Sequence, residues 1–129
     1  MLEKNWTNEE IYLLAERGYG LYQQGFYREA AVLFEGLIVI APENAYCRTA
    51  LAAAYLMLGE QQRAVHELNT VLEQNPANHE ARARRTEVYC DLRQWNEARR
   101  DLEILRRNSQ WQHFHRLQWR MRAAGQSLE

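Results

Sequence analysis

The chain has 129 residues, of which 47% are hydrophobic and 26% charged, and its formal net charge is −1. This length suits a single domain over residues 1–129, and the composition argues against disorder. Because no apolar run approaches the roughly 20 residues of a membrane span, and the first ten residues are polar and acidic, we expect a cytoplasmic protein with neither membrane segment nor secretory signal.

The charge is unevenly distributed along the chain. Residues 1–44 hold three basic and seven acidic side chains, whereas residues 79–129 hold eleven arginines and seven acids. This asymmetry would help to steer a partner or to pair two copies of the chain, unless the arginines simply coat outer helix faces. Cys47 and Cys90 are too far apart for a paired-cysteine motif, so we expect free thiols.

A helix pair is predicted first, over residues 11–44. Thr7 and Glu10 form a capping box before it. Gly25 suits the turn between two helices, since glycine adopts positive φ at helix ends. Two apolar stripes with a period near 3.6 define the helices. They comprise Leu14, Gly18 and Leu21, then Ala30, Leu33, Phe34 and Leu37, closed by Pro42.

This pattern returns every 34 residues, which predicts two further helix pairs over 45–78 and 79–112. Asn44 and Asn78 are the expected N-caps of these pairs. Arg93 replaces the turn glycine of the third pair and Gln110 replaces its proline, so we expect a less regular turn and exit there. The recurring positions are Gly18, Ala52 and Thr86; Leu21, Tyr55 and Tyr89; Ala30, Ala64 and Ala98; Phe34, Leu68 and Leu102; Leu37, Val71 and Leu105.

A final helix is predicted at about residues 110–124. Ser109 and Gln112 offer a capping box for it. Its larger apolar side chains would face the third pair, and they are Trp111, Phe114, Leu117 and Met121. The fold class is therefore all-α.

The segment Leu14-x2-Arg17-Gly18-x2-Leu21, followed by Ala30-x3-Phe34 and Pro42, resembles the tetratricopeptide repeat. This resemblance implies a right-handed solenoid of three helix-turn-helix repeats with a C-terminal capping helix. It also implies that the first helix of each repeat lines a concave, peptide-binding groove. The groove residues expected from helical spacing are Tyr12, Ala15, Tyr19, Tyr22, Tyr46, Thr49, Ala53, Leu56, Met57 and Glu87.

Catalysis is not expected, because the four histidines are scattered and no phosphate-binding loop, nucleophile elbow or metal motif is present. We predict no catalytic residue, cofactor or metal. Nucleic acid is a weaker alternative: arginines and tryptophans gather after residue 81, but acids interleave with them and offset the field. The weaker alternative for the tyrosines is that they pack against an N-terminal segment or against a second copy in a homodimer.

The opening Asn8-Glu9-Glu10-Ile11-Tyr12, with Gly18-Tyr19 and Tyr27-Arg28-Glu29-Ala30, resembles the bacterial type III secretion chaperones of three such repeats. That resemblance implies a non-enzymatic cytoplasmic chaperone that holds an extended hydrophobic, proline-containing segment of a secreted translocator or export component. A scaffold that joins folded proteins is the alternative. Cochaperones that grip a C-terminal carboxylate use lysine, arginine and asparagine in the groove, and the groove residues here do not match that set.

Overall fold

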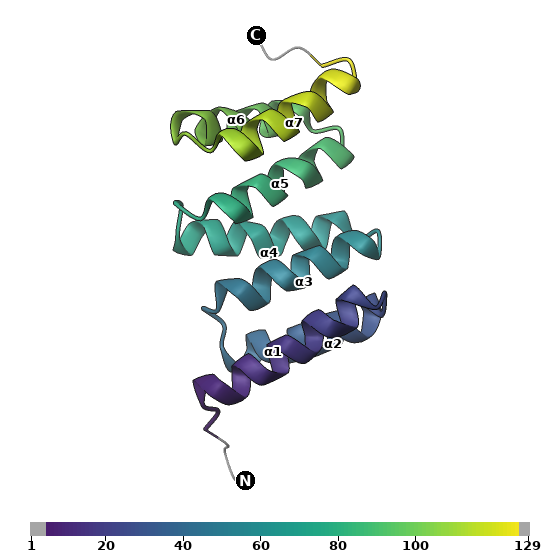
Figure 1. Cartoon of the computed structure of the whole chain (residues 1–129), viewed down its shortest axis with the longest axis vertical. Coiled ribbons are helices and arrows are strands. Elements are labelled where there is room, and N and C mark those ends of the chain that lie inside the picture. Colours follow the sequence, from purple (N-terminus) through teal and green to yellow (C-terminus); the bar gives the residue numbers. More distant parts are fainter. Residues whose placement is uncertain (1–4, 127–129) are drawn as a thin grey trace. The chain divides into compact units, whose positions relative to one another are not determined.

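The computed structural model describes residues 5–126, and within them the chain forms helices and no strand (Figure 1). The predicted all-α fold is confirmed. None of the described helices is both long and apolar enough to cross a membrane. The seven helices are α1 (Asn8–Gln23), α2 (Tyr27–Ile40), α3 (Ala45–Met57), α4 (Gln61–Gln74), α5 (His79–Asp91), α6 (Trp95–Arg107) and α7 (Trp111–Ala123).

The helices divide between two compact units. The first unit, Met1–Glu60, contains α1 to α3, and the second, Gln61–Glu129, contains α4 to α7. In the first unit α2 packs against both α1 and α3. In the second unit α5 packs against α4 and α6, and α7 packs against α5 and α6.

Three helices begin at the caps that the sequence predicts. The Glu10 backbone N–H donates to Thr7 Oγ1 at 3.1 Å, and the Thr7 N–H donates back to Glu10 Oε1 at 3.2 Å. Asn44 and Asn78 each accept a backbone N–H at 3.0 Å through Oδ1. These side chains satisfy amides that a helix leaves unpaired at its start.

The predicted capping box of the last helix is wrong. The residue that caps α7 is Gln110, and its side chain makes no capping hydrogen bond. Ser109 instead adopts φ 57° in the preceding turn. Its backbone N–H donates to the Arg106 carbonyl oxygen, which closes α6 rather than opening α7.

The turn in the third helix pair is as regular as those before it, contrary to expectation. Arg93 has φ 58°, where Gly25 and Gly59 have φ 87° and 76°. The Arg93 N–H donates to Cys90 O at 3.1 Å, as the Gly59 N–H does to Leu56 O at 3.1 Å. The packed helices on either side therefore impose the left-handed turn on a residue that disfavours it.

A close helix contact holds the first unit together. Gly18 of α1 lies against the ring of Phe34 in α2, which is fully buried. A Cβ added at Gly18 would lie 2.8 Å from Phe34 Cζ, which is closer than van der Waals contact allows. The small residue predicted at this position is thus required by the ring that packs on it.

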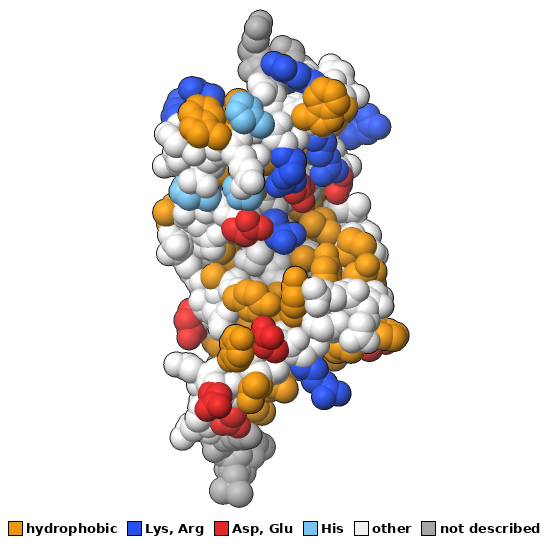
Figure 2. Space-filling model, in the orientation of Figure 1, with side chains coloured by type: hydrophobic (Ala, Val, Ile, Leu, Met, Phe, Trp, Pro, Cys, Tyr) orange, Lys and Arg blue, Asp and Glu red, His pale blue; other side chains and the backbone are white. Residues whose placement is uncertain are grey.

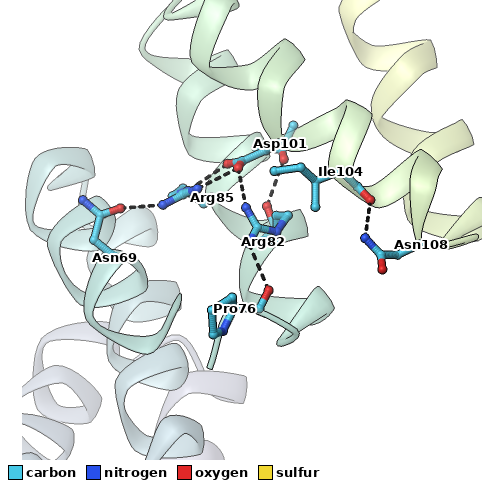
Figure 3. Close-up of polar contacts among 8 residues, drawn as sticks. Asn69, Pro76, Arg82, Arg85, Asp101, Ile104 and Asn108 are labelled. Atoms are coloured by element: carbon cyan, nitrogen blue, oxygen red, sulfur yellow. Dashed lines mark hydrogen bonds and ion pairs between the residues drawn. The ribbon is translucent and has the colours of Figure 1, made fainter. Parts of the chain in front are cut away.

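The second unit contains a buried ionic cluster besides its apolar core (Figure 3). Asp101 of α6 is only 2% exposed, and it accepts hydrogen bonds from Arg82 and Arg85 of α5 at 2.6 to 3.0 Å. Arg85 also donates to Asn69 Oδ1 of α4 at 2.9 Å, and Arg82 to the Pro76 carbonyl at 3.0 Å. One carboxylate therefore links α6 to α5, and through Arg85 to α4.

Candidate functional site

Three tyrosines on one side of the first unit stay exposed, and we call them the tyrosine face. Tyr12 and Tyr19 of α1 are 61% and 44% exposed, and Tyr46 of α3 is 51% exposed. Figure 2 shows hydrophobic side chains gathered over α1 and α3. Large aromatic side chains that a unit's own packing does not cover are common at sites of protein binding.

Small side chains lie between these aromatic ones. Ala15 of α1 and Ala53 of α3 are buried, as expected where two helices approach closely. Thr49 and Leu56 are half-buried, and the Thr49 hydroxyl donates to the Ala45 carbonyl at 2.8 Å. Met57 is exposed, and its flexible thioether suits an adaptable binding surface.

A hollow lies between the N-terminal halves of α1 and α3. Glu16 is the only charged residue among the described residues that line it. It was missed by the sequence analysis, although it follows Tyr12 by four residues and must share its side of the helix. The lining residues are Asn8, Ile11, Tyr12, Ala15, Glu16, Asn44 and Tyr46.

The surroundings of Tyr22 differ from those of the other predicted groove residues of α1. It is half-buried, and its ring lies 5.3 Å from the ring of Tyr27 in α2, edge to face. This contact supports the α1–α2 turn. The Tyr22 ring is therefore partly committed to packing within the unit.

The environment of Tyr46 is desolvated and negative. Partial burial raises the pKa of Tyr46 above its ordinary value of 10.0, and the Glu16 carboxylate raises it further. The phenol therefore stays neutral at physiological pH and can donate a hydrogen bond to a peptide carbonyl. Burial likewise raises the pKa of the neighbouring Cys47 thiol.

Glu87, the predicted groove residue of the second unit, is paired with Arg116 of α7. Asp91 pairs with Arg120 in the same way, and His113 Nε2 lies 3.5 Å from Glu80 Oε2. Figure 2 shows arginine and histidine side chains beside the acidic ones over α5 and α7. Because α7 compensates these carboxylates, this surface is less acidic than α5 alone suggests.

Within residues 5–126, no group of three or more histidine, cysteine, aspartate or glutamate side chains is placed to hold a metal ion. The arrangement on α1 and α3 provides apolar contact area, hydrogen-bonding hydroxyls and one carboxylate. Such a surface is suited to binding a polypeptide.

A family model described as tetratricopeptide repeat matches residues 21–75. Protein PHOX1 of Arabidopsis thaliana is 31% identical over 98 residues, which cover 71% of this chain. The chain spans only 13% and 12% of the length of the two curated relatives it matches.

Solved structures with the same fold include chaperones and peptide-binding domains. The Yersinia enterocolitica type III secretion translocator chaperone SycD superposes with a TM-score of 0.80 at 17% identity, covering 91% of each chain. The first such domain of Spaghetti (RPAP3), bound to the HSP90 peptide SRMEEVD, has a TM-score of 0.81 at 23% identity. That match covers 96% of this chain and all of the other. These likenesses show the tetratricopeptide repeat fold.

Proposed function

We propose that this tetratricopeptide repeat protein binds an extended segment of another protein on its tyrosine face. The observation that carries the proposal is the exposure of Tyr12, Tyr19 and Tyr46 around a hollow of the first unit. Tyrosine offers a large contact area at a low entropic cost and a hydroxyl for peptide groups. The protein acts by holding its client and performs no reaction.

We further propose that the protein is a cytoplasmic chaperone of a type III secretion system. The client is a secreted translocator or export component with an exposed apolar, proline-containing segment. Support comes from the sequence resemblance and from the fold that the chain shares with SycD. Covering about 500 Å² of apolar surface is worth on the order of 12 kcal/mol before ordering costs, and those costs remove much of it. The client is thus held tightly enough to prevent aggregation and loosely enough to be released.

Binding is tested with synthetic peptides that tile any secreted proteins encoded by the neighbouring genes. We expect Tyr19→Ala and Tyr12→Ala, two changes at exposed side chains, each to weaken binding of the best peptide at least tenfold with unchanged helical circular dichroism. Trp119→Ala, in the other unit, is the matched control and should bind normally. Normal binding by both face variants would refute the proposal. So would a dimer in sedimentation analysis that buries the tyrosine face and excludes every peptide.

A scaffold that joins folded proteins is the second candidate, and α7 favours it. Trp119 is 74% exposed, and Trp111 is half-exposed, with its ring stacked on that of His115 at 6.1 Å. The last helix of a repeat array usually has a polar outer side. If Trp119→Ala breaks a native complex that Tyr19→Ala leaves intact, the scaffold is the correct function.

A further inference from the structure

The hollow between α1 and α3 combines aromatic rings with a single negative charge. Tyr12 and Glu16 come from α1 and Tyr46 from α3, and all three line the same space. The remaining lining residues that the structure describes are neutral, so none of them is an arginine or lysine that opposes Glu16. The face of a tyrosine ring carries negative potential, which attracts a cation placed over it.

The Glu16 carboxylate is available to a ligand. Glu16 is exposed, and among residues 5–126 it forms no ion pair. Partial burial raises the pKa of Tyr46, and the Glu16 carboxylate, the charged group named beside it, raises it further. A positive group entering the hollow would therefore meet attraction from the ring faces and the carboxylate together.

Helix N-termini attract anions, and two of them border this hollow. Both are already capped: Thr7 accepts the Glu10 N–H at 3.1 Å, and Asn44 accepts the Cys47 N–H at 3.0 Å. These side-chain caps occupy amides that would otherwise bind an anion. The carboxylate of Glu16 then repels a negative ligand, so the hollow favours a cation.

We propose that this hollow binds a positively charged side chain, arginine or lysine, of the client segment, with the cation between Tyr12 and Tyr46 and paired with Glu16. The proposal rests on the function proposed above and makes it specific. Apolar residues of the client contact the rest of the tyrosine face, while one basic residue fixes its register. A chaperone of this kind selects apolar segments that carry a basic residue at one position.

The test uses small probes that require no knowledge of the client. Acetyl-arginine amide, acetyl-citrulline amide and acetyl-glutamate amide are titrated into the whole chain while the tyrosine ring signals are followed by NMR. We expect the arginine probe to shift the Tyr12 and Tyr46 signals at millimolar concentration, and the neutral and acidic probes to bind at least five-fold more weakly. Equal binding of arginine and citrulline probes would overturn the proposal.

Single substitutions distinguish the contribution of the Glu16 charge to binding from that of the tyrosine rings. Glu16→Gln should weaken the arginine probe about three- to ten-fold, as should Tyr46→Ala, whereas Tyr46→Phe keeps the ring face and most of the affinity. Glu29→Gln, an exposed acid of α2 outside the hollow, is the matched control and should have no effect. An unchanged affinity in Glu16→Gln would refute the role of the carboxylate.

The outcomes also distinguish this proposal from the function on which it rests. If a client peptide binds equally well after its arginine and lysine residues are replaced by glutamine, the protein binds peptides but the cation site is wrong. If the arginine probe binds and no peptide does, the cation site is real and the peptide-binding function is wrong.

Discussion

At position 18 the neighbouring side chain determines which residue the helix can accommodate. The space that a methyl group would need at this position is filled by the Phe34 ring, and both residues are buried. Since Phe34 is enclosed by the first unit, its ring cannot move aside without opening a space elsewhere. The contact therefore limits α1 to the smallest side chain at the point where it meets α2.

Replacing Gly18 by alanine should destabilise the protein by about 1 to 3 kcal/mol, the usual cost of overpacking a core. Gly36→Ala is the matched control, because Gly36 lies inside α2 with no atom within 4 Å of an added Cβ. That change should stabilise by about 0.5 to 1 kcal/mol, since alanine favours helix. Urea unfolding of both variants checks the prediction, and equal effects would contradict the close contact.

Arg93 is a residue whose backbone is strained by its surroundings. A non-glycine residue in the left-handed region costs about 1 to 2 kcal/mol, and Arg93 has φ 58°. Arg93→Gly should stabilise the folded chain by about 0.5 to 1 kcal/mol, because the greater freedom of glycine in the unfolded chain offsets part of the gain. Gly59→Ala, at the equivalent turn, should destabilise it instead. Thermal unfolding measures both, and a less stable Arg93→Gly would show that the strain argument is wrong.

At the scale of helices, the second unit depends on a carboxylate that belongs to no apolar stripe. Asp101 is nearly inaccessible and receives three hydrogen bonds from two arginines. The hydrogen bonds that Arg85 donates to Asp101 raise the pKa of Arg85 above its ordinary value, although partial burial opposes the effect. A buried charge pair is costly to break, since the remaining charge loses its partner without regaining water.

Asp101→Ala should therefore cost about 3 to 5 kcal/mol of unfolding free energy, because it leaves two arginines without their shared partner. Glu103→Ala, two residues later in α6, is the matched control. Glu103 also pairs with two arginines, Arg106 and Arg107, but all three side chains are well exposed, so its loss should change stability little. Denaturant unfolding of the two variants should differ clearly. Similar losses would mean that burial does not determine the strength of this cluster.

The helices were predictable because the same pattern of apolar and turn residues recurs along the chain. The apolar stripes recur three times at a spacing of 34 residues, and the turn glycines Gly25 and Gly59 and the caps Asn44 and Asn78 each recur once at that spacing. The ion pairs of α7 with α5 were not predictable in this way. Arg116 of the capping helix and Glu87 of α5 lie 29 residues apart, and no local pattern indicates that one reaches the other. Glu16 was not among the predicted groove residues, because the helical spacing used for them selects Tyr12, Ala15, Tyr19 and Tyr22.

At the scale of the whole molecule, the chain separates an aromatic, acidic part from a basic one. Residues 1–44 carry an excess of four acids and residues 79–129 an excess of four arginines. In the second unit Arg84, Arg116 and Arg120 are paired with α5 carboxylates, and these pairs leave the net excess of arginine unchanged. The expectation that residues 1–129 fold as one domain stays a prediction, and the two compact units make it a testable one.

Each unit contains one sulfhydryl group shielded from solvent, Cys47 in α3 and Cys90 in α5. Burial raises the pKa of both, so neither forms a reactive thiolate readily while its helix is packed. The rate of alkylation at each cysteine therefore reports the rate at which its own unit opens. At fixed pH and reagent concentration, both cysteines of a single cooperative domain would be alkylated at the same rate. Two independent rates would mean that one half can loosen to admit or release a client while the other stays closed.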